Sequence, residues 1–255
     1  MTRIPASNVW FVRPKPNPRA RLRLFCFPYA GGGSVIYRSW IEHLPEAIEL
    51  WCLRLPGRES RLAEPPFTRL MPLVTALAEV ILPYLDVPFA FFGHSMGGLI
   101  SFELIHAIGR RHDLVPIHAF VSGHRAPHLP DRNLPIHRLP AAELVGHLRR
   151  LNGTPEMVLE NMELMQLLLP IIRADFAVCE TYGYTAREPL PCPISVFGGL
   201  QDPRVSYEEL AAWRDQTCSA FSHRMFPGGH FFLHGAQALL LWALCRDLAA
   251  YLGDA

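Results

Sequence analysis

The chain has 255 residues, of which half are hydrophobic and 18% are charged. This composition excludes a disordered segment and predicts one folded domain with a large core. The formal net charge is +1 and the basic residues are scattered, which argues against a nucleic-acid-binding or anionic-membrane-binding protein. No apolar run reaches the ~20 residues of a membrane span, and no signal-peptide pattern follows Arg3, so we expect a cytoplasmic protein.

The six cysteines are widely separated and include no Cys-x-x-Cys pair. Zinc or redox chemistry is therefore not indicated, and we expect neither a metal nor a cofactor. Cys26 and Cys52 lie in apolar runs and are expected to be small core residues. Residues 13–23 are basic and rich in proline, which favours a solvated N-terminal arm.

Short apolar runs alternate with longer segments of helical periodicity along the chain. Strands are predicted at residues 22–27, 48–53, 89–93, 118–122, 194–198 and 222–226. Helices are predicted at residues 35–44, 71–84, 98–109, 207–216 and 235–251. Strands that are apolar throughout are typical of strands buried on both faces, so the pattern predicts an α/β fold with a mostly parallel sheet flanked by helices.

The connection between the strands at 118–122 and 194–198 is far longer than an ordinary strand-helix-strand unit of ~30 residues. Within it, residues 141–151 and 163–179 have helical periodicity, and Thr154-Pro155 resembles an N-cap followed by proline at the first helical position. We therefore predict a single domain over residues 1–255 with a helical insert at about 125–185. Because it follows the carboxyl end of a strand, the insert is expected to be a lid over the site, the alternative being a subdomain without a function.

The motif Gly-x-Ser-x-Gly occupies residues 93–97, directly after a predicted strand and before a predicted helix. A nucleophile elbow needs this sharp strand-to-helix turn, which pushes the serine above the sheet. Ser95 is therefore the predicted nucleophile. The amide of Met96, at the start of the helix, is predicted to donate a hydrogen bond to an oxyanion.

A serine hydroxyl needs a base to take its proton, and twelve histidines are present. His230 lies in the loop Pro227-Gly228-Gly229-His230, directly after the last predicted strand, and is the predicted base. His234 is the nearest competitor. His94 is expected to pack in the elbow, because adjacent side chains there point in different directions.

A carboxylate must orient the base. The strand at 118–122 has none at its carboxyl end, whereas Asp202 follows the strand at 194–198, so Asp202 is the predicted acid. The alternative is that Asp202 is only a turn residue before Pro203. Glu208 and Glu209 lie a helical turn further on and are less well placed.

The first predicted strand runs into Pro28-Tyr29-Ala30-Gly31-Gly32-Gly33, where glycines let backbone amides approach a ligand. Tyr29 or Ala30 is expected to provide the second oxyanion amide, and spacing does not separate them. A phosphate-binding loop is disfavoured because no Walker lysine follows and Ile36 stands where a third dinucleotide-binding glycine would be.

With these motifs in place, the chain resembles the stand-alone type II thioesterases that accompany nonribosomal peptide and polyketide synthases. The resemblance covers residues 22–250 and rests on Phe27-Pro28-Tyr29-Ala30-Gly31-Gly32, Pro56-Gly57-Arg58, Gly93-His94-Ser95-Met96-Gly97-Gly98, Leu169-Pro170-Ile171-Ile172-Arg173-Ala174-Asp175, Gly199-Leu200-Gln201-Asp202 and Gly228-Gly229-His230-Phe231.

The resemblance implies an α/β-hydrolase fold and a substrate that is an acyl group on the phosphopantetheine of a partner's carrier domain, removed to free a stalled synthase of an antibiotic or siderophore pathway. We also expect a monomer, and the charge pattern indicates neither a nucleic-acid nor a membrane partner. The residues themselves predict acyl transfer to water through an acyl-Ser95 intermediate. Met157, Met162 and Met165 are compatible with a lid that adapts to flexible acyl chains, although packing explains them equally well.

Three other functions remain open at this point. The first is a medium-chain acyl-releasing thioesterase or general carboxylesterase. The second is an acyltransferase in which an alcohol or amine replaces water. The third is a binding module that keeps the fold without catalysis.

Overall fold

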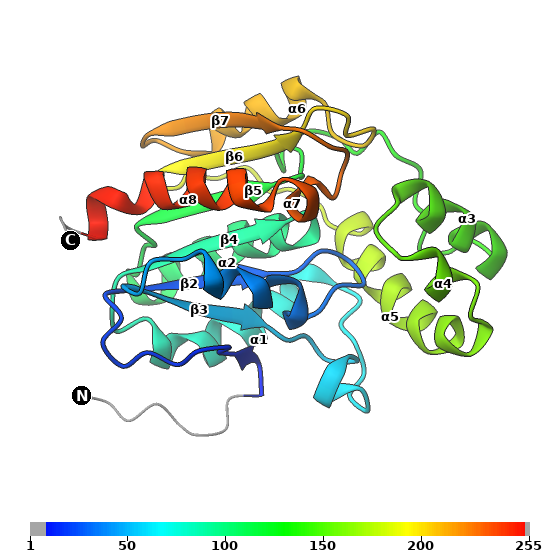
Figure 1. Cartoon of the computed structure of the whole chain (residues 1–255). Helices are drawn as coiled ribbons and strands as arrows, with labels where there is room; N and C mark the ends of the chain where they lie inside the picture. The colour runs from blue at the N-terminus through cyan, green and yellow to red at the C-terminus, as the bar shows by residue number, and fades with distance from the viewer. Residues whose placement is uncertain (1–8, 253–255) are drawn as a thin grey trace.

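The computed structural model describes residues 9–252, and within them seven strands form one sheet in the order β1-β3-β2-β4-β5-β6-β7 (Figure 1). All neighbouring strands run parallel except β1, which is antiparallel to β3. The strands are β1 (Phe11–Val12), β2 (Leu22–Phe27), β3 (Ile48–Leu53), β4 (Phe89–His94), β5 (His118–Ser122), β6 (Ile194–Gly199) and β7 (Phe221–Phe226).

The six predicted strands are confirmed. Three have the predicted bounds and the others are one residue longer. Alternate residues of β2 enter opposite apolar layers: Leu24 and Cys26 pack on one side of the sheet, and Phe25 and Phe27 on the other. A strand buried on both faces has no polar side, which is why β2 is apolar at nearly every position.

Helices cover both faces of the sheet (Figure 1). Apolar side chains of α1 and α2 join one layer, and those of η1 and α8 join the other. Outside the segment between β5 and β6, the helices are η1 (Ser34–Glu42), η2 (Glu59–Arg61), α1 (Leu70–Ile81), η3 (Leu82–Tyr84), α2 (Met96–His112), α6 (Tyr207–Ala211), η4 (Ala212–Gln216), α7 (Phe232–Gly235) and α8 (Gln237–Leu252). The α/β fold is therefore confirmed, although the helix predicted at 35–44 is the 3₁₀ helix η1, which ends at Glu42, and residues 207–216 divide into α6 and η4.

The basic stretch 13–23 is solvated in its middle and packed at both ends. Lys15, Arg19 and Arg21 are exposed, as expected. Arg13, however, donates to Glu49 at 2.9 Å and lies over the ring of Trp51, while Arg23 is only 8% exposed. The expectation was wrong at these two ends because both arginines lie against residues far away in the chain.

The segment between β5 and β6 contains α3 (Ala141–Leu151), α4 (Glu156–Leu159) and α5 (Met162–Glu180), which lie together at one end of the sheet (Figure 1). These helices share an apolar cluster of their own that includes Leu144, Leu159 and Met165. The predicted cap is wrong by one position: Pro155 is itself the N-cap of α4, and no side chain caps that helix.

Within residues 9–252, no helix is long and apolar enough to cross a membrane. Over the same range, no group of three or more His, Cys, Asp or Glu side chains is arranged to hold a metal ion.

The buried histidine of β5 makes stability depend on pH. His118 stacks on Phe120 with ring centroids 4.4 Å apart, and its Nε2 lies 2.8 Å from the hydroxyl of Ser195. Burial, with a smaller contribution from Arg224, lowers the pKa of His118 from about 6.5 to about 4. Between these values the unfolded chain binds a proton that the folded chain does not, so stability falls as the pH falls.

As the pH falls from 6 to 4.5, we expect His118 to lower the free energy of unfolding by about 1.4 kcal/mol for each pH unit. Urea unfolding at several pH values should show that the free energy of unfolding depends less steeply on pH in His118→Gln than in the parent chain. The matched control is His112→Gln, because His112 is exposed at the end of α2 and should leave the slope unchanged. An unaltered slope in His118→Gln would contradict this assignment.

Candidate active site

Ser95, His230 and Asp202 lie in one hydrogen-bonded line at the carboxyl edge of the sheet. Nε2 of His230 is 3.1 Å from Oγ of Ser95, and Nδ1 of His230 is 2.8 Å from Oδ2 of Asp202. The carboxylate of Asp202 is fully buried and also accepts the backbone N–H of Arg204 at 2.8 Å. The structure therefore brings together the three residues predicted from the motifs, in the geometry of a serine–histidine–aspartate triad.

The turn that carries Ser95 is strained and tightly packed. Ser95 has a φ of +51°, a conformation that is costly for a residue with a Cβ. A Cβ on Gly97 would lie 2.0 Å from the carbonyl oxygen of Phe27, so only glycine lets α2 begin this close to the end of β2. The elbow thus places the amide of Met96 at the N-terminus of α2, beside Ser95.

The competing residues have other partners. Nε2 of His234 lies 3.0 Å from the hydroxyl of Tyr29. Glu209 closes the capping box of α6, and Glu208 is exposed. Neither glutamate is hydrogen-bonded to His230.

His94 is buried in the elbow, as expected. Its Nδ1 lies 2.8 Å from the hydroxyl of Ser122, and its ring packs 5.3 Å from that of His230. Burial, followed by the proximity of His230 and His234, holds the pKa of His94 well below its usual value. His94 therefore stays neutral and packs against the ring of His230.

The first loop forms a β-turn stabilised from two sides. The N–H of Gly32 donates to the carbonyl of Tyr29 at 2.9 Å, and Gly31 has the positive φ of +78° that a type II turn requires at its third position. The N–H of Gly31 donates to Oδ2 of Asp175 at 2.7 Å. Because the amides of Gly31 and Gly32 are occupied, Tyr29 and Ala30 remain as possible donors from this turn.

Asp175 is a site residue to which the sequence interpretation assigned no role. It lies on α5 and forms a buried ion pair with Arg58, whose position follows β3. Both residues stand in motifs that carry the family resemblance, at Pro56-Gly57-Arg58 and Arg173-Ala174-Asp175. Their presence in these motifs indicated that Arg58 and Asp175 matter, but neither motif by itself indicates that the two side chains contact each other.

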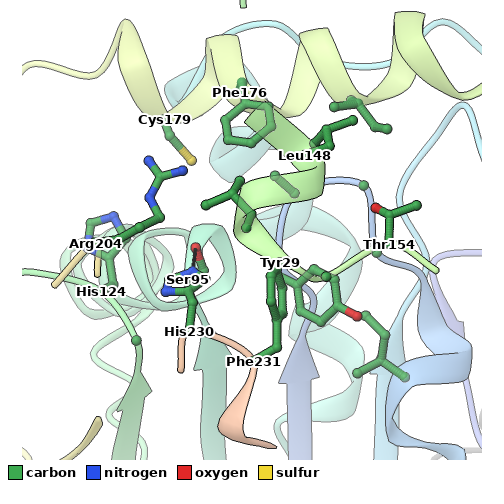
Figure 2. Close-up of a pocket in the computed structure, with 18 of the residues that line it drawn as sticks. Tyr29, Ser95, His124, Leu148, Thr154, Phe176, Cys179, Arg204, His230 and Phe231 are labelled. Atoms are coloured by element: carbon green, nitrogen blue, oxygen red, sulfur yellow. Dashed lines mark hydrogen bonds between the residues drawn. The ribbon is translucent and has the colours of Figure 1, made fainter. Parts of the chain in front are cut away.

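A cavity of about 330 Å³ opens above Ser95 and His230. Figure 2 shows Phe176 and Leu148, from the helices between β5 and β6, across the cavity from Ser95. The apolar part of the lining comes mainly from α3, α4 and α5, whereas the more polar part comes from the loops that follow β5 and β6. The apolar part includes Leu148, Leu151, Val158, Leu168, Ile172 and Phe176, and the polar part includes His124, Arg125, Asp131, Asn133 and Arg204.

The three methionines whose flexibility is compatible with an acyl chain do not line this cavity. Met157 and Met162 are 78% and 80% exposed, whereas Met165 packs inside the apolar cluster of the helices, in line with the alternative that packing explains it. Residue type alone does not show which side of a short helix faces the cavity. Branched aliphatic side chains and Phe176 form the apolar lining instead.

Comparison with known proteins gives the same family from sequence and from structure. The family model described as "Thioesterase domain" matches residues 22–250. Gramicidin S biosynthesis protein GrsT of Aneurinibacillus migulanus is 48% identical over 97% of both chains. The medium-chain S-acyl fatty acid synthase thioesterase of Rattus norvegicus is 32% identical, over 85% of this chain and 83% of that protein.

Among solved structures, the type II thioesterase BorB from the borrelidin biosynthetic cluster superposes with a TM-score of 0.87. It is 34% identical, and the match covers 96% of this chain and 98% of BorB. The chain therefore belongs to the thioesterase family and is a serine hydrolase of the type II thioesterase group associated with nonribosomal peptide and polyketide synthases.

Proposed function

We propose that this thioesterase hydrolyses acyl groups from the phosphopantetheine thiol of carrier domains, through an acyl intermediate on Ser95. The observation that carries the proposal is the series of hydrogen bonds from Asp202 through His230 to Ser95, at distances of 2.8 and 3.1 Å, beneath a cavity of about 330 Å³. The similarity to GrsT, a protein of gramicidin S biosynthesis, supports a role beside a peptide synthase.

In the first half of the reaction, Nε2 of His230 takes the Ser95 proton as Oγ attacks the thioester carbonyl. Asp202 holds Nδ1–H of His230 and stabilises the imidazolium that forms. The negative charge that develops on the carbonyl oxygen is stabilised by the amide of Met96 and by one amide of the first loop, that of Ala30 or Tyr29. When the carbon–sulfur bond breaks, His230 returns the proton and the pantetheine thiol leaves.

In the second half, a water molecule gives a proton to His230 and attacks the acyl-Ser95 carbonyl. The same amides stabilise the second oxyanion. Collapse of that intermediate releases the carboxylic acid and restores the Ser95 hydroxyl. The polar loops after β5 and β6 and the apolar helices α3–α5 offer different surroundings to the two ends of an acyl-pantetheine substrate.

The triad assignment predicts distinct results at neighbouring positions. We expect Ser95→Ala and His230→Asn to lower kcat by at least about 10³-fold, because each removes part of the nucleophile and base unit. His234→Asn is the matched control for His230→Asn, since the ring of His234 is hydrogen-bonded to the hydroxyl of Tyr29 and to neither Ser95 nor Asp202, and it should keep kcat within about threefold. Steady-state hydrolysis of acyl-pantetheine thioesters checks this. Full activity of Ser95→Ala would refute a serine mechanism and favour a binding role.

The carrier-bound substrate is tested by comparing three acyl donors with the same acyl group. We expect kcat/KM to be highest for the acyl carrier domain, lower for free acyl-pantetheine and lowest for a nitrophenyl ester. Mass spectrometry of the carrier follows deacylation directly. Equal kcat/KM for all three donors would contradict the editing role and favour a general esterase. Formation of an ester or an amide from an added alcohol or amine would indicate an acyltransferase.

We also propose that the chain is one domain in which residues of about 125–185 act as a lid. The contact that supports this lies between the turn after α3 and the loop of His230. A Cβ on Gly153 would lie 2.2 Å from the ring of Phe231, so this part of the segment rests directly on the residue after His230. The lid proposal is thus tied to the position of Gly153.

Gly153→Ala should push the helices away from Phe231, which would raise KM for an acyl substrate severalfold with a smaller change in kcat. Gly146→Ala is the matched control, because a Cβ there meets only the end of Arg150 at 3.9 Å. The control should leave KM unchanged and stabilise α3 by roughly 0.5–1 kcal/mol, as alanine does in helices. An equal KM in both variants, measured by initial rates, would argue against the lid.

We propose further that the enzyme works as a monomer in the cytoplasm. Its six cysteines are all free thiols, which suits a reducing compartment. Sedimentation at several protein concentrations tests the monomer, and a mass that rises with concentration would contradict it.

A further inference from the structure

Two opposite charges are buried beside the cavity, between α5 and the loop after β3. Nη2 of Arg58 is 2.7 Å from Oδ1 of Asp175, and Nη1 of Arg58 is 2.8 Å from Oδ2. The two side chains are only 7% and 3% exposed. Burying a charged pair costs desolvation free energy. The attraction between the two groups offsets this cost only when further hydrogen bonds satisfy their remaining donors and acceptors.

Both members of the pair also bind the backbone of the first loop. The N–H of Gly31 donates to Oδ2 of Asp175 at 2.7 Å, and Nη1 of Arg58 donates to the carbonyl of Gly32 at 2.6 Å. These bonds satisfy further hydrogen-bonding groups of the buried pair and at the same time attach it to the loop. Here α5 and the loop after β3 together fix two consecutive residues of the turn.

The orientation of the turn determines where the amide of Ala30 points. The carbonyl of Tyr29 faces inward, because it accepts the N–H of Gly32 at 2.9 Å. Tyr29 and Ala30 are joined by a trans peptide, so the N–H of Ala30 points away from the turn, opposite to that carbonyl. Tyr29 and Ala30 both line the cavity that contains Ser95, and the N–H of Ala30 is the one whose direction the turn fixes, which makes it the better of the two donors left open by the sequence.

We propose that Arg58 and Asp175 are positioning residues that hold the turn at residues 29–32 so that the N–H of Ala30 meets the oxyanion formed at Ser95. This proposal rests on the serine mechanism set out above. An oxyanion donor acts at 2.7–3.1 Å from the oxygen, and it stabilises the transition state more than the bound substrate. Loss of the pair should therefore slow the reaction without weakening substrate binding.

The first test is Asp175→Asn, which keeps the size of the side chain and removes its charge. We expect kcat to fall by about 10- to 100-fold, less than the loss of an entire oxyanion donor, with KM nearly unchanged. A trifluoromethyl ketone analogue, whose adduct with Ser95 places an oxyanion in the same position, should bind more weakly by a similar factor. A non-hydrolysable thioether analogue should bind as it does to the parent enzyme.

A purely structural role gives a different result, and Arg224→Met measures it. Arg224 and Asp247 form another ion pair of low exposure, between β7 and α8, and neither lines the cavity. This control should lower Tm while leaving both kcat and the affinity ratio of the two analogues unchanged. If Asp175→Asn also changes only Tm, or weakens both analogues equally, the positioning role is overturned.

Two more variants keep the test decisive if Asp175→Asn folds poorly. Arg58→Lys retains the charge next to Asp175 but lacks the fork that reaches both carboxylate oxygens and Gly32, so it should show a smaller loss of the same kind with a near-parental Tm. Arg58→Met combined with Asp175→Asn should cost no more kcat than the worse single change, because the pair acts as a unit. Additive losses would contradict that coupling.

These outcomes are separable from failure of the serine mechanism. Full activity in Ser95→Ala overturns the proposed function itself. An inactive Ser95→Ala together with parental kcat and analogue affinities in Asp175→Asn overturns only the positioning role.

Discussion

The close approach between the start of α2 and the end of β2 is the constraint on which the site depends. Gly97 lies against the carbonyl of Phe27, and no side chain fits between them. Because β2 and β4 are neighbours in the sheet, this contact brings the elbow and the first loop to the same edge. The strained φ of Ser95 is tolerated there because α2 is buried against the sheet along most of its length.

The remaining parts of the site arrive from the carboxyl ends of other parallel strands. Asp202 follows β6 and His230 follows β7, the last strand on this side of the sheet. The loop after β7 nevertheless brings the ring of His230 between Asp202 and Ser95, within hydrogen-bonding distance of both. The helices inserted after β5 add the apolar part of the cavity. The sheet therefore supplies the reactive groups, whereas the insertion supplies most of the apolar surface around the substrate.

Features encoded over a few neighbouring residues could be predicted from the sequence, and contacts between distant segments could not. The apolar runs identified six strands, and Gly-x-Ser-x-Gly between a strand and a helix identified Ser95. Position after the last two strands identified Asp202 and His230, now seen within hydrogen-bonding distance. The contact from Asp175 to Arg58 and Gly31 has no local signature, since these residues are far apart in the chain. Partners distant in sequence likewise explain why Arg13, at the start of the basic N-terminal stretch, packs against the sheet, where it donates to Glu49.

The helix α5 is divided by Pro170, which cannot donate the backbone hydrogen bond of a helix interior. Before the proline most side chains are exposed, and after it Ile171, Ile172, Ala174 and Asp175 are buried. The half after the proline thus carries both the Arg58 contact of Asp175 and two residues that line the cavity, Ile172 and Phe176. A change of acyl preference made at Ile172 or Phe176 therefore acts on the same buried segment as Asp175, whereas Leu168, which also lines the cavity, lies on the other side of Pro170 and can be changed separately from it.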